Sequence, residues 1–254
     1  MTSPWNRQLP EPGATPELVS LGLTEGLLGA RSLDGRTHVL VRSFRVFDCP
    51  VAGEVFTLDV ANCCRSGGRW ILEGRPHSPR LDVDALALEH LAVFDRGDYW
   101  ELESVVPEVP GVSSPDRSAI REILRFKEGG ERDLAENLAG EILARDVRCL
   151  EAHVLLGDLF RDGPLETRWT ERALRHYAVG VAIAEDSLGD SFRGTLPWRF
   201  RANRPYLRCL YWKARCLEKV GDAGPAGEVF ERLLTVAPED PLRVRETVGR
   251  VSPN

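Results

Sequence analysis

Residues 207–240 read LRCLYWKARCLEKVGDAGPAGEVFERLLTVAPED, and this stretch decides how the second half of the chain folds. Its apolar residues recur at the three- and four-residue spacing of a helix, as at Leu207, Leu210 and Leu217. A glycine-containing segment then interrupts the pattern, the spacing resumes as far as Leu233, and Pro238 ends it. The stretch therefore predicts two helices joined by a tight turn.

Four positions of this unit agree with a known repeat. Counted from Leu207, small residues stand at 8 and 20 (Ala214 and Ala226), an aromatic residue stands at 24 (Phe230), and Pro238 stands at 32. The unit thus resembles a tetratricopeptide repeat, a helix-turn-helix motif of about 34 residues. Small residues allow the two helices to approach closely, and the proline ends the second helix.

Two earlier segments carry the same pattern. Residues 150–187 place Gly157 at position 8, with Tyr177 at position 24 once about four residues are inserted in the turn. Residues 116–149 follow the pattern less closely, since Ala139 replaces the aromatic residue. The resemblance implies a tetratricopeptide-like helical repeat domain over 116–254 with an insertion at 188–206, and an irregular helical bundle is the alternative. Within that insertion Asn203, ahead of Pro205, is predicted to cap the last helical pair.

Residues 36–106 are predicted to form a small β-rich domain. Alternating apolar residues predict strands over 37–47 and 54–60, and a third over 69–73 that Gly74, Pro76 and Pro79 end. A short helix over 84–90 and two strands around the turn at 95–98 follow. The order of three strands, a helix and two strands matches an OB-like barrel, while a β-sandwich or an SH3-like barrel fits comparably well.

The remaining segments complete an α+β chain. Residues 1–35, rich in proline and glycine, are expected to form a flexible lead-in with a short helix around 16–28. Residues 107–115 have the composition of a linker. The predicted fold is therefore a small N-terminal β-domain, OB-like in one interpretation, followed by an all-α array of helical hairpins.

The composition excludes several classes of protein. The 254 residues are 43% hydrophobic and 28% charged, which is too apolar for a disordered chain. A net charge of -6 argues against a generally basic nucleic-acid binder. No apolar run is long enough for a membrane span, and residues 1–17 lack the apolar core of a signal peptide, so the predicted location is cytoplasmic. The six cysteines are then expected to be free thiols, and the scarcity of lysine beside abundant arginine indicates the coding bias of a high-GC bacterium.

The repeat resemblance predicts a non-catalytic adaptor that binds another protein. Such arrays hold a peptide or helix in a concave groove, which the last repeat would line with Arg208, Tyr211, Arg215 and Lys219. Arg201 and Arg204, just before them, complete the predicted contact set. Family members that bind chaperones use lysine and asparagine there to hold a terminal carboxylate, and this chain lacks that set. Arg208 and Arg215, seven residues apart on one helical face, are suited to an acidic peptide segment.

A nucleic-acid partner is the alternative. Residues 193–219 carry eight basic residues and one acidic residue, a net charge of +7, with five aromatic residues among them. Basic and aromatic side chains together are what single-stranded nucleic acid binds, and an OB-like domain would add to this surface. A structural role, in which the aromatic residues pack the insertion onto the repeats, stays open as a third interpretation.

No catalytic motif is present. The chain has no phosphate-binding G-x-x-x-x-G-K-[ST] loop, no G-x-S-x-G elbow and no kinase signature. Cys63 and Cys64, with Cys49 near in sequence and His77, are candidate ligands of a soft metal, but their spacing does not favour a zinc site. For His153 and His176 a packing or surface role is predicted. We therefore expect no enzyme activity, no metal and no cofactor.

Overall fold

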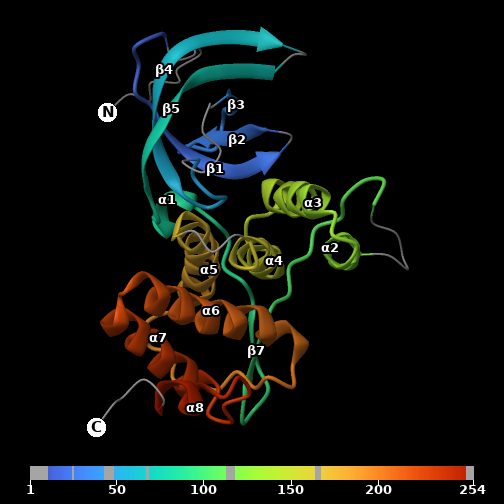
Figure 1. Ribbon diagram of the computed structural model, residues 1–254, viewed down its shortest axis with the longest axis vertical. Coiled ribbons are helices and arrows are strands. Elements are labelled where there is room, and N and C mark those ends of the chain that lie inside the picture. Colours follow the sequence, from blue (N-terminus) through green and yellow to red (C-terminus); the bar gives the residue numbers. More distant parts are fainter. Residues whose placement is uncertain are drawn as a thin grey trace. The chain divides into compact units, whose positions relative to one another are not determined.

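The computed structural model describes residues 11–24, 26–42, 49–66, 69–112, 118–163 and 167–249 (Figure 1). The chain divides into two compact units. The first, here called the barrel unit, comprises Met1–Leu88 and Pro107–Val147, and the second, the helical unit, comprises Glu89–Val106 and Arg148–Asn254. Each unit is described by itself.

A closed five-stranded barrel forms the first part of the chain. Its strands are β1 (Glu17–Thr24), β2 (Leu27–Ser32), β3 (His38–Arg42), β4 (Val55–Ser66) and β5 (Arg69–Arg80). They follow the order β1-β2-β3-β5-β4, in which only the pair β3–β5 is parallel. A closed barrel of five strands in this non-sequential order is consistent with the OB-like interpretation. The predicted α+β fold class, a β-domain followed by helices, is confirmed.

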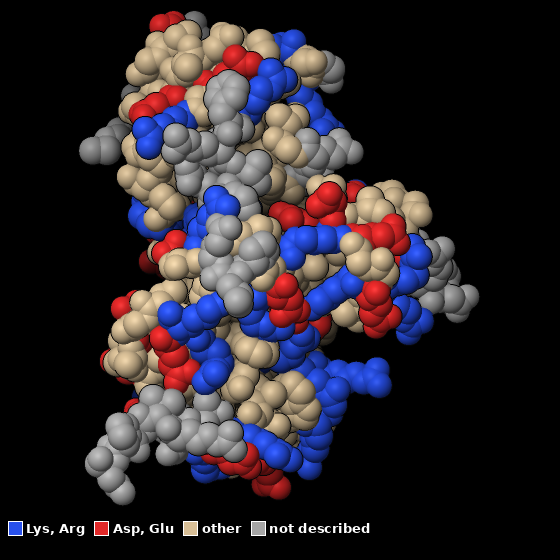
Figure 2. Space-filling model, in the orientation of Figure 1, with Lys and Arg blue, Asp and Glu red and all other residues tan. Residues whose placement is uncertain are grey.

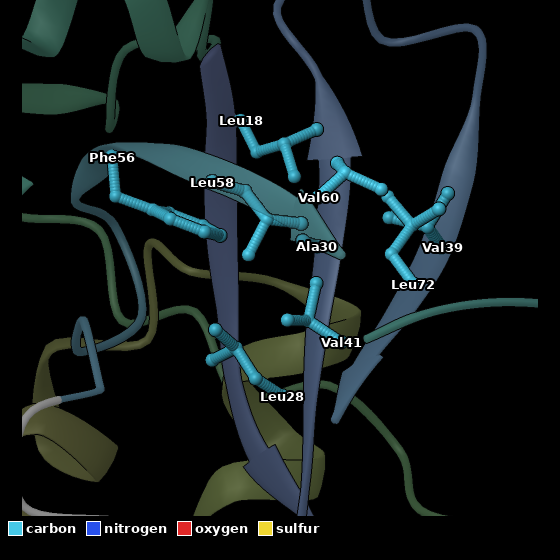
Figure 3. Packing of buried hydrophobic residues seen from close by; sticks show 9 residues of the cluster. All are labelled: Leu18, Leu28, Ala30, Val39, Val41, Phe56, Leu58, Val60 and Leu72. Carbon is cyan, nitrogen blue, oxygen red and sulfur yellow. The ribbon is translucent and has the colours of Figure 1, made fainter. Parts of the chain in front are cut away.

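The barrel interior is filled by side chains from all five strands. Figure 3 shows these nine residues converging: Leu18, Leu28, Ala30, Val39, Val41, Phe56, Leu58, Val60 and Leu72. Because successive side chains of a strand point to opposite faces, β2 buries every second residue. Outside this core, Val19 and Val55 pack against Leu86 of α1 (Val83–Leu86), a short helix that the Asp82 side chain caps.

The expected lead-in is wrong for residues 16–28, which hold no helix. They contribute β1 and the start of β2, two of the five barrel strands. The alternation of Leu28, Ala30 and Ser32 is a strand signal. The glycines of this region interrupt the alternation, so the strand is hard to recognise from the sequence. Gly22 has a φ of +102°, and this conformation allows the register of β1 with β2 to shift at that point.

The predicted end of the third strand at Gly74 is also wrong, because β5 continues to Arg80. Among the described residues its pairing with β3 ends at Glu73, and beyond that point β4 is the one described strand that pairs with it. Pro76 and Pro79, which lack an N–H donor, are tolerated where β5 has one described strand as a neighbour. Gly74 is needed for a close approach, because a Cβ there would lie 2.2 Å from the Asp59 carbonyl oxygen.

The set of strands that forms the barrel also differs from the predicted set. The hairpin of β6 (Val93–Asp95) and β7 (Trp100–Leu102) was expected in the β-domain, but it belongs to the helical unit. Conversely, α2 (Ala119–Glu128) and α3 (Arg132–Arg145) group with the barrel. Helix α3 packs against β1, and Gly22 and Gly140 meet at this contact.

Four helices form the body of the helical unit: α4 (Leu150–Arg161), α5 (Thr167–Leu188), α6 (Arg204–Val220) and α7 (Ala223–Val236). Each packs on the next, and α4 also contacts α6. Small residues set these contacts, since a Cβ on Gly157 would lie 2.4 Å from the Tyr177 ring and one on Gly180 would lie 2.7 Å from Cys209 Sγ. The short helix α8 (Val244–Gly249) follows.

Asn203 binds the β6–β7 hairpin to the helices. It ends the 3-10 turn η2 (Arg201–Asn203), and its buried side chain accepts a hydrogen bond from the Leu102 N–H and donates to the carbonyl oxygens of Trp100 and Pro197. The predicted side-chain cap on α6 is therefore wrong, because the Asn203 backbone is itself helical and its side chain is engaged elsewhere. Pro205 does lie in the first turn of α6.

Replacement of Gly74 tests the strand contact. We expect Gly74→Ala to lower the free energy of unfolding by about 1–3 kcal/mol, because the added methyl group must displace the Asp59 backbone. Gly29→Ala is the matched control in β2, where the nearest atom is 3.5 Å away. Urea unfolding of both variants measures the difference, and equal midpoints would contradict this account.

Candidate functional site

The predicted contact residues lie on one helix or just before it. Arg201 is exposed in η2, and Arg204 begins α6. Arg208, Tyr211, Arg215 and Lys219 follow at intervals of three or four residues, which places them along one face of α6. The structure gives them different surroundings.

Arg208 is already paired with carboxylates of its own unit. Its guanidinium donates to Glu151 at 2.9 Å and to Asp158 at 2.7 Å, both on α4. Burial raises the pKa of Glu151, and the Arg208 charge opposes that rise. Arg208 therefore joins α4 to α6, and its two η nitrogens are engaged inside the protein.

Asp158 is the centre of this network. Its carboxyl group is nearly buried and also accepts hydrogen bonds from the Tyr177 hydroxyl at 2.8 Å and from Arg161 at 2.7 Å. Burial, together with the Asp158 charge, raises the pKa of Tyr177, so this hydroxyl remains a donor. One carboxylate thus connects three helices.

Arg161 is held against an aromatic ring. Its guanidinium carbon lies 3.7 Å from the centroid of Trp212, while Asp158 and Asp162 bind its nitrogens. Tyr211 packs edge-on against Trp212 at 4.9 Å between ring centroids and against Phe230 at 6.3 Å. Tyr211 therefore packs against both Trp212 and Phe230 and supports them.

A cleft of about 600 Å³ opens beside these residues, near the turn between α6 and α7. Its lining is Arg161, Thr170, Trp212, Arg215, Cys216, Glu218, Lys219, Gly221, Ala223, Ala226, Gly227 and Phe230. Of the predicted contact residues, only Arg215 and Lys219 reach it. Arg161 and Trp212 are not among the predicted contact residues, and Phe230 was predicted only as the aromatic position of the last repeat.

The charges at the cleft are unevenly compensated. Arg215 donates to Glu218 at 2.7 Å, and Arg161 has its two aspartates. Lys219 is exposed and makes no ion pair within the described part of the chain. The Cys216 thiol at the wall is buried, and burial raises its pKa to about 11, so it is a weak nucleophile. The cleft therefore combines a mainly apolar lining with three cationic side chains, of which Lys219 is the one without an ion pair among the described residues.

The basic and aromatic side chains at the start of segment 193–219 largely pack on one another. Arg204 donates to the Trp198 carbonyl at 2.9 Å, and its guanidinium lies over the Trp198 ring. Phe200 stacks on Tyr99 at 4.6 Å between centroids, with Arg199 over both rings. These contacts support the structural interpretation of this part of the segment. Figure 2 shows basic and acidic side chains interspersed over the visible face.

A second groove, of about 620 Å³, lies on the barrel unit between the strands and α3. Its floor is made by Leu21, Gly22, Gly29, Val39 and Leu40, and its basic residues are His38, Arg69 and Arg145. Arg145 is partly neutralised by Glu141 at 3.0 Å. The strands β2 and β3 contribute most of this floor.

The residues weighed for catalysis and metal binding do not assemble into such a site. His77 is bound to Asp59 at 3.2 Å and to Ser78, and the described residues hold no group of three metal-binding side chains. All six cysteines are free thiols. His153 and His176 lie side by side, with ring centroids 5.8 Å apart, and both are buried in the helical unit.

The comparisons with known proteins add no family. No family model, no curated protein and no solved structure matches this chain. Among the residues that the structure describes, no helix has the length and apolar character that a membrane crossing requires. The functional argument consequently rests on the geometry of the two units.

Removal of the Asp158 charge tests the network. We expect Asp158→Asn to lower the free energy of unfolding by about 2–4 kcal/mol, because the Asn amide group faces an arginine in place of a carboxylate. Asp162→Asn is the matched control, since this exposed carboxylate pairs with the same Arg161 and should contribute less than about 1 kcal/mol. Chemical denaturation of the two variants gives the comparison, and similar losses would contradict the central role of Asp158.

Protonation of His176 provides a pH test. Burial, followed by the nearby His153 and Arg172, holds the pKa of His176 well below its usual value. In the unfolded chain the pKa of a histidine is about 6.5, and above that pH the neutral His176 ring imposes no cost on folding. Below that pH the free energy of unfolding falls by up to about 1.4 kcal/mol per pH unit, because the unfolded state binds a proton that the folded state does not. We expect His176→Phe to lose less stability than wild type between about pH 7 and pH 5. Exposed His90→Gln should behave as wild type, and identical slopes for wild type and His176→Phe would refute the assignment.

Proposed function

We propose that the helical unit is a non-catalytic protein-interaction module that docks an acidic segment of another protein against α6. The observation that carries this proposal is the meeting of Arg161, Arg215 and Lys219 at one apolar cleft, although Arg161 comes from a different helical hairpin. Charge at the rim and apolar walls suit a segment that presents both carboxylates and apolar side chains.

The packing of α4 to α7 supports the tetratricopeptide-like part of the proposal. Gly157 and Tyr177 occupy positions 8 and 24 of the middle repeat, and they are in contact. The first helices of the two hairpins, α4 and α6, also touch each other. In this proposal Arg215 and Lys219 contact the partner, Arg208 positions α4 and α6, and the protein acts in the cytoplasm.

Selection from a random peptide library on the full chain tests the docking function. We expect enriched peptides with a net negative charge that bind wild type at least tenfold more tightly than Arg215→Glu/Lys219→Glu. The control is Arg193→Glu/Arg243→Glu, which makes the same change of charge at exposed positions outside the cleft and should bind as wild type does. Absence of enrichment, or equal loss in both double variants, would refute the proposal.

Nucleic-acid binding by the barrel unit is a second candidate function. The observation that favours it is the groove on β2 and β3, because OB-like barrels bind oligonucleotides on that face. The described lining of this groove contains no Phe, Tyr or Trp, and His38 is its one ring on which a base could stack, which weakens the case.

A titration of fluorescent single-stranded DNA and RNA at low and moderate salt decides between the candidates. Binding through the groove should weaken steeply with salt and be lost in Arg69→Glu/Arg145→Glu. Binding through the basic segment should instead be lost when the exposed arginines at 199 and 201 become glutamate, a change that leaves the Arg208 network intact. No binding at low salt would remove both nucleic-acid sites.

A further inference from the structure

The cleft of the helical unit has the size of a small-molecule site. Its volume of about 600 Å³ lies within the range of roughly 300–1,000 Å³ that such sites occupy. The aromatic residues Trp212 and Phe230 and the small residues Ala223, Ala226 and Gly227 belong to its apolar wall. A mainly apolar wall with a few polar groups at one side is the usual composition of these sites.

Gly227 indicates that the space is kept open. It lies inside α7, where glycine weakens a helix relative to alanine. No neighbour requires it, since a Cβ on Gly227 would have nothing within 4 Å, and its φ is not positive. By contrast, Gly157 and Gly180 in the same unit are required by close contacts. Gly227 lines the cleft, and it places no side chain in the space beside it.

The charged residues that line the cleft indicate the charge of its ligand. Arg161 and Arg215 have carboxylate partners, whereas Lys219 makes no ion pair among the described residues. With Arg161 paired to Asp158 and Asp162, and Arg215 paired to Glu218, the uncompensated charge among the described lining residues is the positive charge of Lys219. An anionic group at the mouth is therefore favoured and a cationic group is disfavoured.

We propose that this cleft binds a small organic anion with an aromatic or other bulky apolar body. The apolar body packs against Trp212 and Phe230, and the anionic group pairs with Lys219. This binding site goes beyond the docking function and requires only the cleft. An acidic side chain of a docked peptide, next to an apolar one, would present the same groups to the cleft. The displacement experiment below distinguishes a free small anion from such a peptide.

Three probes that share one ring test the proposal: 2-naphthoate, its neutral amide and 2-naphthylmethylamine. Isothermal titration with the full chain should show that the carboxylate binds at least tenfold more tightly than the amine, with the amide between them. Equal affinity for the three probes, or no binding of 2-naphthoate at millimolar concentration, would overturn the proposal.

Two variants locate the binding. Gly227→Leu places a side chain in the cleft and should weaken 2-naphthoate binding at least tenfold. Gly224→Leu is its matched control on the same helix, because Gly224 is exposed, has nothing within 4 Å of a Cβ and does not line the cleft. Unchanged binding by Gly227→Leu would overturn the assignment to this cleft.

Lys219→Glu keeps the test valid if Gly227→Leu folds poorly, because the Lys219 side chain is exposed on the surface. This variant should bind 2-naphthylmethylamine more tightly than 2-naphthoate, which reverses the wild-type preference. An unchanged preference would overturn the role of Lys219.

The outcome is separable from that of the docking function. If the library yields acidic peptides and 2-naphthoate does not bind, the docking function stands and this inference fails. If 2-naphthoate binds and no peptide is enriched, this inference stands and the docking function fails. If a selected peptide is displaced by 2-naphthoate in wild type but not in Gly227→Leu, a free small anion and a docked peptide share the cleft.

Discussion

The carboxylate of Asp158 connects more of the helical unit than any other side chain described above. It lies on α4, accepts the Tyr177 hydroxyl from α5 and binds Arg208 of α6. A buried carboxylate is stable only when donors surround it, so α5 and α6 must each be in register with α4 for both of these bonds to form. Because Asp158 also binds Arg161, the same network fixes the guanidinium that lies over Trp212 at the cleft.

The sequence predicted the helices better than it predicted the barrel. The helices predicted from apolar spacing, and the small residues Gly157 and Ala214 predicted at helix contacts, are found in the structure. These signals depend on contacts between neighbouring turns and neighbouring helices, which lie close together in the sequence. The closed barrel depends instead on pairings between distant segments, such as β1 with β4. Local pattern therefore found β3, β4 and β5 but mistook the glycine-rich β1 for a lead-in. It also assigned the hairpin at Val93–Leu102 to the barrel, since nothing in its own residues shows that Asn203 binds it.

The candidate site was predicted in part for a related reason. Spacing along one helix places Arg208 and Arg215 on the same face, and that much can be derived from sequence. Whether an arginine is available depends on carboxylates elsewhere, and Glu151 lies 57 residues from Arg208 along the chain. A count of charges over residues 193–219 cannot include such partners. Lys219, by contrast, has no ion pair in the described chain, and it reaches the cleft as its position on α6 suggested.

The division into units has a consequence for how the chain can be taken apart. The polypeptide leaves the barrel unit after Leu88, returns to it at Pro107 and leaves it again after Val147. Neither unit is a continuous stretch of sequence. During synthesis the barrel unit is incomplete until α3 has emerged, although its fifth strand ends at Arg80. A single cut, by a protease or by gene truncation, therefore cannot separate the units cleanly: a cut after Val147 leaves the barrel unit with residues 89–106 attached, and a cut after Leu88 leaves the helical unit with residues 107–147 attached.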